Sequence, residues 1–259
     1  NYRSNVPFAV LGVFILWFGW LGFNGGSCLG LDAKTGLVLL NTTIGAAAGM
    51  AGALVYHAIF IRRGNYLIAV FDGVLGGLVA ITACSYYVQP TGAAMLTFIT
   101  GFAVMASHYL LKKLGIDDAV DAVPVHAAGG ICGLLLLPFF AESEYISGSR
   151  SAQFAVQLLG VSVNIVWVFG LSYIMFKIIN RVMGMRVSGQ SEEQGLNISE
   201  FDDIYSWEKH QEISSYETSI SDKNRLLRKQ ARLLTVTEEQ EKDNIRRELH
   251  DGVGQSLAA

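Results

Sequence analysis

The chain has 259 residues, of which 51% are hydrophobic and 16% charged, and its mean hydropathy is +0.38. Soluble domains carry about a quarter charged residues, so this deficit argues against one soluble globular domain and for a bilayer environment. Charges are sparse between residues 6 and 176 and dense from residue 177 onward. A net charge of −3 averages over two such different regions and predicts no particular partner; we expect no nucleic acid. The sequence therefore predicts a membrane-embedded region followed by a soluble one.

Six apolar runs approach the length of about 20 residues that a helix needs to cross the hydrocarbon core. Glycine and alanine recur in all of them, and small residues let transmembrane helices approach closely. The predicted fold is all-α: a polytopic transmembrane helical bundle, followed by a cytoplasmic coiled-coil or phosphoacceptor helix. The six runs cover approximately residues 6–26, 35–61, 67–88, 93–111, 123–140 and 154–179.

Basic residues in the loops orient these runs. They follow the second, fourth and sixth runs, and the intervening loops hold fewer. By the positive-inside rule the even-numbered spans end in the cytoplasm, so the soluble tail is cytoplasmic. We therefore expect a multi-pass protein of the inner (cytoplasmic) membrane. The basic residues in question are Arg62, Arg63, Lys112, Lys113, Lys177, Arg181 and Arg186.

The two ends of the sequence indicate whether it is a whole protein, and the three cysteines indicate whether it has disulfides or a metal site. The first residues include neither a methionine nor a basic leader, and the chain stops inside a helical pattern. We interpret it as the middle of a longer protein.

The three cysteines lie in or beside apolar runs without CxxC spacing: Cys28, Cys84 and Cys132. We expect small packing residues there, with no disulfide framework and no metal site.

The most informative stretch is residues 117–132, DDAVDAVPVHAAGGIC, in which clustered carboxylates and a proline precede His126. A histidine in a membrane-length apolar helix is costly to bury, so it usually faces a polar cavity or the bundle interior. The alternative is a satisfied histidine packed between helices. We expect the carboxylates to cap the start of the fifth helix. They are Asp117, Asp118 and Asp121.

This stretch, DDxxDxxxVH, resembles the second half of the Amt/Mep/Rh ammonium transporters. The likeness continues in matching order through LWFGWLGFNGGS at residues 16–27 and DGVLGGLVAITA at residues 72–83. The resemblance implies ammonium as ligand and a homotrimer. It implies that Phe23 is a gate of the pore, Ser27 a hydroxyl at the outer ammonium site, Trp20 an aromatic beside the pore histidines, and His126 one of that pair.

The chemistry of these residue types suits that role. Aromatic faces attract a dehydrated cation, a hydroxyl can accept its hydrogen bond, and a neutral imidazole can accept or relay a proton. Taken alone, Trp20 and Phe23 would more often be packing or lipid-facing aromatics, and Ser27 could bond to a helix carbonyl. The sequence departs from the family in two ways. The family's first five spans are absent from it, and the residues directly after His126 are alanines, whereas the family usually has a glycine at the first of these positions.

Two further histidines and an aspartate also lie in the apolar runs. His57 and His108 are near the expected cytoplasmic ends of their helices, and we expect them at the membrane interface. Asp72 stands near a helix start, where the family usually has a small or amide residue. It is either a helix-terminus contact or a local functional change.

The region after residue 186 has two parts, a tail similar to that of the family and then a polar helical stretch. Residues 187–207 are similar to the C-terminal tail of the ammonium transporters, with Asn197 and residues 201–203 altered. From Ser221 a polar helical pattern carries leucine pairs a heptad apart, which predicts a seam for a partner helix, here another copy of the chain. The leucines are Leu226, Leu227, Leu233 and Leu234.

Residues 245–257, IRRELHDGVGQSL, resemble the phosphoacceptor helix of HDxxxQ-type sensor histidine kinases. The resemblance implies that His250 is phosphorylated, that Asp251 is the adjacent base and that Gln255 positions water. A response regulator is the implied partner. We expect no cofactor in this chain, and ATP with Mg²⁺ for a kinase domain outside it, so this chain alone should not autophosphorylate.

Three hypotheses follow: an ammonium sensor that regulates a fused kinase, an ammonium transporter with an appended helix, and a packing subunit without a ligand. The phosphoacceptor pattern favours the sensor over the transporter, and the pore residues argue against the packing subunit. The predicted regions are residues 1–186 for the membrane domain, 187–221 for the linker and 222–259 for the signalling helix. Trimeric pores and paired kinase helices differ in symmetry, and we expect the linker to absorb the mismatch.

Overall fold

A computed structural model describes residues 6–62, 66–194 and 204–257, with side chains described except at residues 193–194, 204–211, 236, 239, 241 and 243–257. The chain divides into two compact units, Asn1–Met175 and Phe176–Ala259. Helices make up both units, and within the described ranges the only β-type pairing is an isolated bridge between Val88 and Ala141. The expectation of an all-α fold is confirmed.

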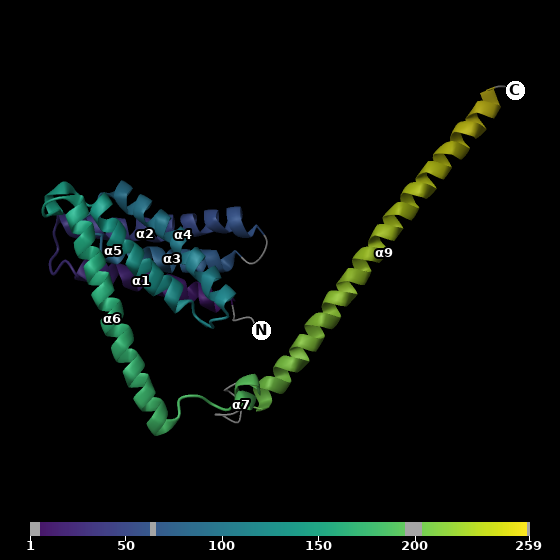
Figure 1. The fold of residues 1–259 in the computed structure, drawn as a ribbon. Helices are drawn as coiled ribbons and strands as arrows, with labels where there is room; N and C mark the ends of the chain where they lie inside the picture. Colours follow the sequence, from purple (N-terminus) through teal and green to yellow (C-terminus); the bar gives the residue numbers. More distant parts are fainter. Residues whose placement is uncertain (1–5, 63–65, 195–203, 258–259) are drawn as a thin grey trace. The chain divides into compact units, whose positions relative to one another are not determined.

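The first unit contains a bundle of five apolar helices and most of a sixth (Figure 1). Among the described residues, five segments are long and apolar enough to cross a membrane, and α3 is a shorter apolar helix. In order the elements are α1 (Val6–Gly26), α2 (Ala33–Tyr56), the π-helix η1 (His57–Ile61), α3 (Leu67–Thr82), α4 (Pro90–Leu114), the π-helix η2 (Val123–Ala128), α5 (Gly129–Phe140), the 3₁₀ turn η3 (Ser143–Tyr145) and α6 (Arg150–Met183).

The third run is shorter than the sequence indicates. A helix was expected over residues 67–88, but α3 ends at Thr82 and turns follow. The buried side chain of Asn41 explains how the chain can leave the helix there. Its Nδ2 donates to the carbonyls of Ser85 and Val88 at 2.9 and 2.8 Å, which satisfies backbone groups that a continued helix would have paired.

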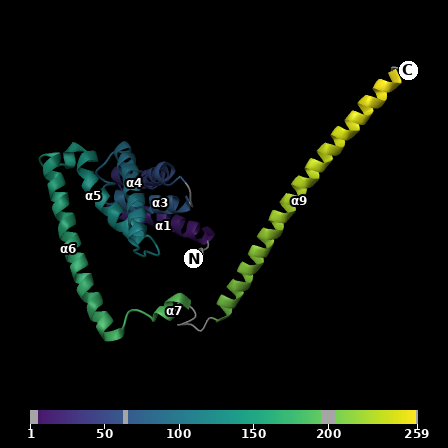
Figure 2. The same ribbon diagram turned by 45° about the vertical axis from the view of Figure 1, so that its right-hand side comes forward.

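Helix α2 packs closely against both α3 and α4 because glycines line its contacts. A Cβ at Gly52 would lie 2.1 Å from the carbonyl oxygen of Phe98 on α4. A Cβ at Gly77 of α3 would lie 2.2 Å from the carbonyl oxygen of Gly45 on α2. The expectation that small residues let these helices pack on one another is confirmed. Helices α1 to α5 remain gathered in one bundle when the view is turned (Figure 2).

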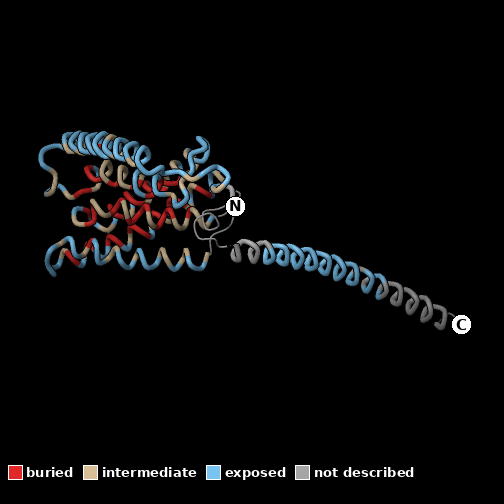
Figure 3. Tube along the Cα trace, turned by 90° about the horizontal axis from the view of Figure 1, so that it is seen from below, coloured by how far each residue is buried: buried red, intermediate tan, exposed pale blue. Residues whose placement is uncertain are grey.

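The helices differ in how far their residues are buried (Figure 3). The buried apolar residues concentrate in α2 to α5, whereas Asn24 is the one buried residue of α1 and Val161 that of α6 among the described residues. The apolar side chains that α1 and α6 expose are the kind that lipid or another protein covers. The second unit contains α7 (Gly189–Gln194) and α9 (Ile204–Leu257). The described side chains of α9, from residue 212 on, are all exposed.

Candidate functional site

Three of the four expected pore residues lie at the end of α1. The Trp20 indole Nε1 donates to Thr82 Oγ1 at 2.7 Å, and this bond ties α1 to the last residue of α3. The rings of Trp20 and Phe23 meet edge to face with centroids 6.4 Å apart. Phe23 is 62% exposed, so its other face is available to a ligand or a neighbouring helix.

Ser27 lies just beyond α1, where it lines a cavity of about 440 Å³. Its Oγ donates to the carbonyl of Phe23 at 2.8 Å, which leaves the oxygen lone pairs available to accept a bond. The helix-carbonyl bond considered from the sequence is therefore present, and it does not use up the hydroxyl. Buried Asn24 holds this wall in place, because its Nδ2 donates to Thr42 Oγ1 at 3.0 Å. The lining residues are Asn24, Ser27, Cys28, Val38, Thr82, Ala83, Ser85, Tyr86 and Tyr87.

His126 is not among the residues that line this cavity. It lies on η2, where its side chain is exposed. Its neighbours Pro124 and Val125 are buried, so the π-helix fixes the backbone while leaving the imidazole on the surface. π-helical turns are rare and frequently mark functional positions. Within the described chain, Trp20 contacts Phe23 and Ser27 bonds to the Phe23 carbonyl, and of the four expected pore residues only Ser27 lines the cavity.

The three aspartates before η2 have three different surroundings. Asp117 is exposed. Asp118 accepts hydrogen bonds from the backbone N–H groups of Val123 and Ala122 at 2.7 and 2.9 Å. These donors, that of Val123 first, hold the pKa of the Asp118 carboxyl below its usual range. Asp121, at φ 53°, directs its carboxylate to His108 instead of to the helix start.

The contact of Asp121 belongs to a cluster that the sequence did not indicate. His108 of α4 has Nδ1 2.6 Å from Asp121 Oδ1 and 3.8 Å from Asp72 Oδ2. Asp72 is 5% exposed, and its Oδ2 has no hydrogen-bond partner. The sequence analysis considered each of these residues separately, but the three share no motif spacing, so the sequence carries no signal that they form one cluster.

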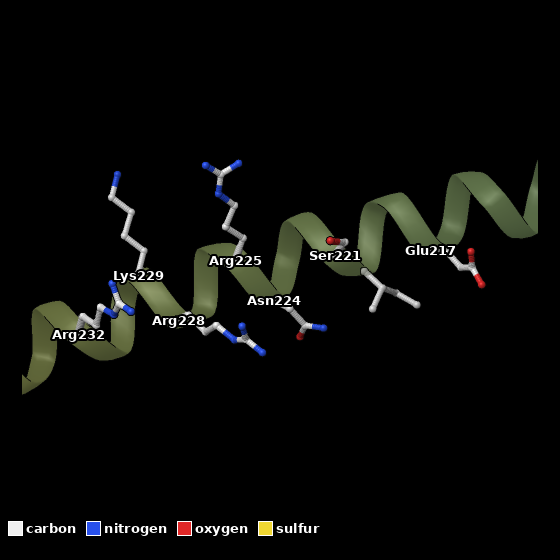
Figure 4. A pocket seen from close by; sticks show the side chains of 8 residues that line it. Glu217, Ser221, Asn224, Arg225, Arg228, Lys229 and Arg232 are labelled. Carbon is white, nitrogen blue, oxygen red and sulfur yellow. The ribbon is translucent and has the colours of Figure 1, made fainter. Parts of the chain in front are cut away.

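Helix α9 presents an open surface over the part whose side chains are described. The hollow drawn in Figure 4 is lined by residues of α9 alone, so it is one side of a single helix. Four of the lining residues are basic: Arg225, Arg228, Lys229 and Arg232. The backbone of α9 continues through His250, Asp251 and Gln255, whose side chains lie outside the described residues. Asn197 and residues 201–203 lie outside them as well.

Comparison with known proteins gives consistent matches over the membrane region. The model of the Ammonium Transporter Family matches residues 2–205. Ammonium transporter Amt2 of Archaeoglobus fulgidus is 38% identical over 210 residues, 76% of this chain and 44% of that protein. Ammonium transporter Amt2 of Methanocaldococcus jannaschii is 36% identical over 197 residues, 76% of this chain and 45% of that protein.

Solved structures agree with these matches. One described as "Sensor Amt Protein" aligns with a TM-score of 0.72 at 42% identity, over 76% of this chain and 49% of that one. Mep2 of Saccharomyces cerevisiae aligns with a TM-score of 0.63 at 28% identity, over 70% of this chain and 43% of that one. The chain thus spans under half the length of each of these four relatives.

Proposed function

The chain belongs to the Ammonium Transporter Family, and from that premise we propose that it binds ammonium in its membrane part and signals through a phosphoacceptor histidine, His250. It is a multi-pass membrane protein. The observation that carries the proposal is that one continuous helix connects the family-matched region to the phosphoacceptor-like stretch. The family match ends at residue 205, and the helix that starts at Ile204 runs on through the IRRELHDGVGQSL stretch. A relative described as "Sensor Amt Protein" supports the sensing half of the proposal.

The cavity beside Ser27 suits a small cation. Its wall offers the hydroxyls of Ser27 and Ser85 as acceptors, and Tyr86 and Tyr87 line the same cavity. Phe23 and Trp20 lie about one and about two turns before Ser27 on α1. Aromatic faces and hydroxyl oxygens can together replace part of the water that ammonium loses on binding. His126 would act as an acceptor or relay at a separate point of the path.

Signalling requires partners outside this chain. In the proposed assembly the membrane part forms a homotrimer in the inner membrane, with its C-terminus in the cytoplasm. Helix α9 pairs with another copy through the exposed Leu226, Leu227, Leu233 and Leu234. A kinase domain that binds ATP and Mg²⁺ then phosphorylates His250. Asp251 orients its imidazole, Gln255 positions water for dephosphorylation, and a response regulator receives the phosphoryl group.

The test uses the natural, full-length protein in lipid vesicles, with phosphorylation from labelled ATP measured with and without ammonium. The wild type should show a level that follows ammonium, and His250→Gln should remove the label. Ser27→Ala should shift the ammonium response by about tenfold or more, because a hydrogen bond to a charged group contributes about 1.5–3 kcal/mol. Ser162→Ala is the matched control, since Ser162 makes the same bond to a helix carbonyl at 2.8 Å on exposed α6. A label indifferent to ammonium would overturn the sensor.

Ammonium conduction is the second candidate, favoured by relatives that are named ammonium transporters. The same vesicles distinguish the two, because conduction would give an ammonium-dependent current or internal pH change. Current without ammonium-dependent phosphorylation would leave a transporter whose appended helix has another input. Phosphorylation without current would leave a pore that binds ammonium and does not conduct it.

A further inference from the structure

We propose that Asp72, His108 and Asp121 form a binding site for a divalent transition-metal ion of the Zn²⁺ or Co²⁺ class. One potential ligand atom from each residue lies within 4.8 Å of the other two. The donors come from three elements: α3, α4 and the segment before η2. The sequence predicted no metal site because its cysteines lack metal spacing, whereas this cluster forms only when the helices pack.

The charge balance of the cluster points to a cation. Asp72 is 5% exposed and its Oδ2 accepts no hydrogen bond, although a buried carboxylate oxygen normally has a partner. The one hydrogen bond of His108 Nδ1 goes to Asp121. A protonated His108 would balance one of the two carboxylates and leave the other unbalanced. Lys112, a turn further along α4, is exposed to solvent, where its charge is screened.

The ligand types fit a metal of this class. One imidazole nitrogen and two carboxylate oxygens are typical donors for Zn²⁺, and three protein ligands leave a position for water. With bonds of about 2.0–2.2 Å, tetrahedral donors lie roughly 3.3–3.5 Å apart. His108 Nδ1 is 2.6 Å from Asp121 and 3.8 Å from Asp72. For a metal to enter, the His108–Asp121 distance must lengthen and the His108–Asp72 distance must shorten, each by less than about 1 Å.

The site lies next to the π-helix that carries His126, so a bound metal would affect the position of that helix. Asp121 is two residues before η2 and five before His126, and its backbone has φ 53°. A metal bound to Asp121 would fix this segment against α3 and α4. It would thereby hold the π-helix that carries His126 in one position. The site lies at the end of the bundle that we place in the cytoplasm.

The direct test is a titration of the purified full-length protein with Co²⁺, after chelator treatment, followed by visible absorption. We expect one saturable equivalent per chain whose absorption band Zn²⁺ removes. Asp72→Asn and His108→Gln should each weaken binding at least tenfold. Asp117→Asn is the matched control and should leave it unchanged, because Asp117 is exposed nearby and outside the cluster. Absence of a saturable band, or equal binding by all variants, would overturn the site.

A second measurement needs no substitution and covers the case in which the variants fail to fold. Diethyl pyrocarbonate modifies accessible histidines, and mass spectrometry locates the product. Zn²⁺ should slow modification of His108 several-fold, while exposed His126 reacts at an unchanged rate. If Zn²⁺ leaves the reactivity of His108 unchanged, the site does not bind metal. Neither readout depends on ammonium or on kinase activity, so failure here is separate from failure of the proposed sensor.

Discussion

Helices α2 to α4 differ from helix α9 in how far their apolar side chains are covered by the rest of the chain. In the bundle, Gly52 and Gly77 bring backbones together, and the apolar side chains at these helix contacts, such as Leu78 and Leu96, are buried within the same chain. In α9, Leu226 and Leu233 are 58% and 60% exposed. A long polar helix with a leucine seam is stable when another helix covers that seam. The contacts among α2, α3 and α4 are therefore made within one chain, whereas the leucines of α9 would be covered only by the proposed pairing with a second copy.

The largest effect is expected where the bundle helices approach most closely. Gly52→Val would place a Cβ 2.1 Å from the Phe98 carbonyl oxygen, where backbone must move, and should cost about 3 kcal/mol or more. Thermal unfolding in detergent measures it. Gly36→Val on the same helix meets nothing within 4 Å and should change stability by less than about 1 kcal/mol. Equal effects at both positions would show that backbone approach does not limit α2.

The next effect concerns α9 and its partner. Leu233→Ala should weaken helix pairing by about 1.5–3 kcal/mol per chain, because each buried leucine contributes that much. A cysteine at Leu226 reports pairing through disulfide cross-linking in vesicles, with Gln230→Ala as the exposed polar control. Cross-linked species larger than a trimer would support pairing between trimers. Closed trimers alone would contradict it.

A smaller effect is expected at the start of η2. Asp118→Ala removes the acceptor of two backbone N–H groups and should cost about 0.5–2 kcal/mol, with exposed Asp117→Ala near zero. Because the folded pKa of Asp118 is lowered, its contribution is fully present above the usual pKa of about 3.9 and is lost as pH falls through the folded value. Unfolding measured against pH should therefore show the difference between wild type and Asp118→Ala at neutral pH and lose it in acid.

The smallest effect is expected at the tie between α1 and α3. Trp20→Phe removes the 2.7 Å bond to Thr82 and keeps a ring, so it should cost about 0.5–1.5 kcal/mol. Trp17→Phe makes the same change in ring size without touching that bond. Thermal unfolding of the two variants should differ in this direction. A Trp20 variant as stable as the Trp17 variant would mean that ring packing, not the hydrogen bond, holds α1.

The membrane helices were predictable to different degrees. Hydropathy and length are local properties, and they placed α1 and α2 within a few residues. The end of α3 was missed because it depends on Asn41, a residue of another helix that satisfies the turn after Thr82. Ser27 was recognised by its family motif, yet its cavity includes Tyr86 and Tyr87 from that same turn.

The sequence by itself determined the fold class, the apolar spans and the family resemblance, because each depends on residues that are close together in the chain. Only the tertiary structure brought Asp72, His108 and Asp121 close together, and only it showed that Tyr86 and Tyr87 line the cavity beside Ser27. Such placements arise from the packing of helices whose glycine contacts set the distance and register between them. Spacing along the chain carries no record of them.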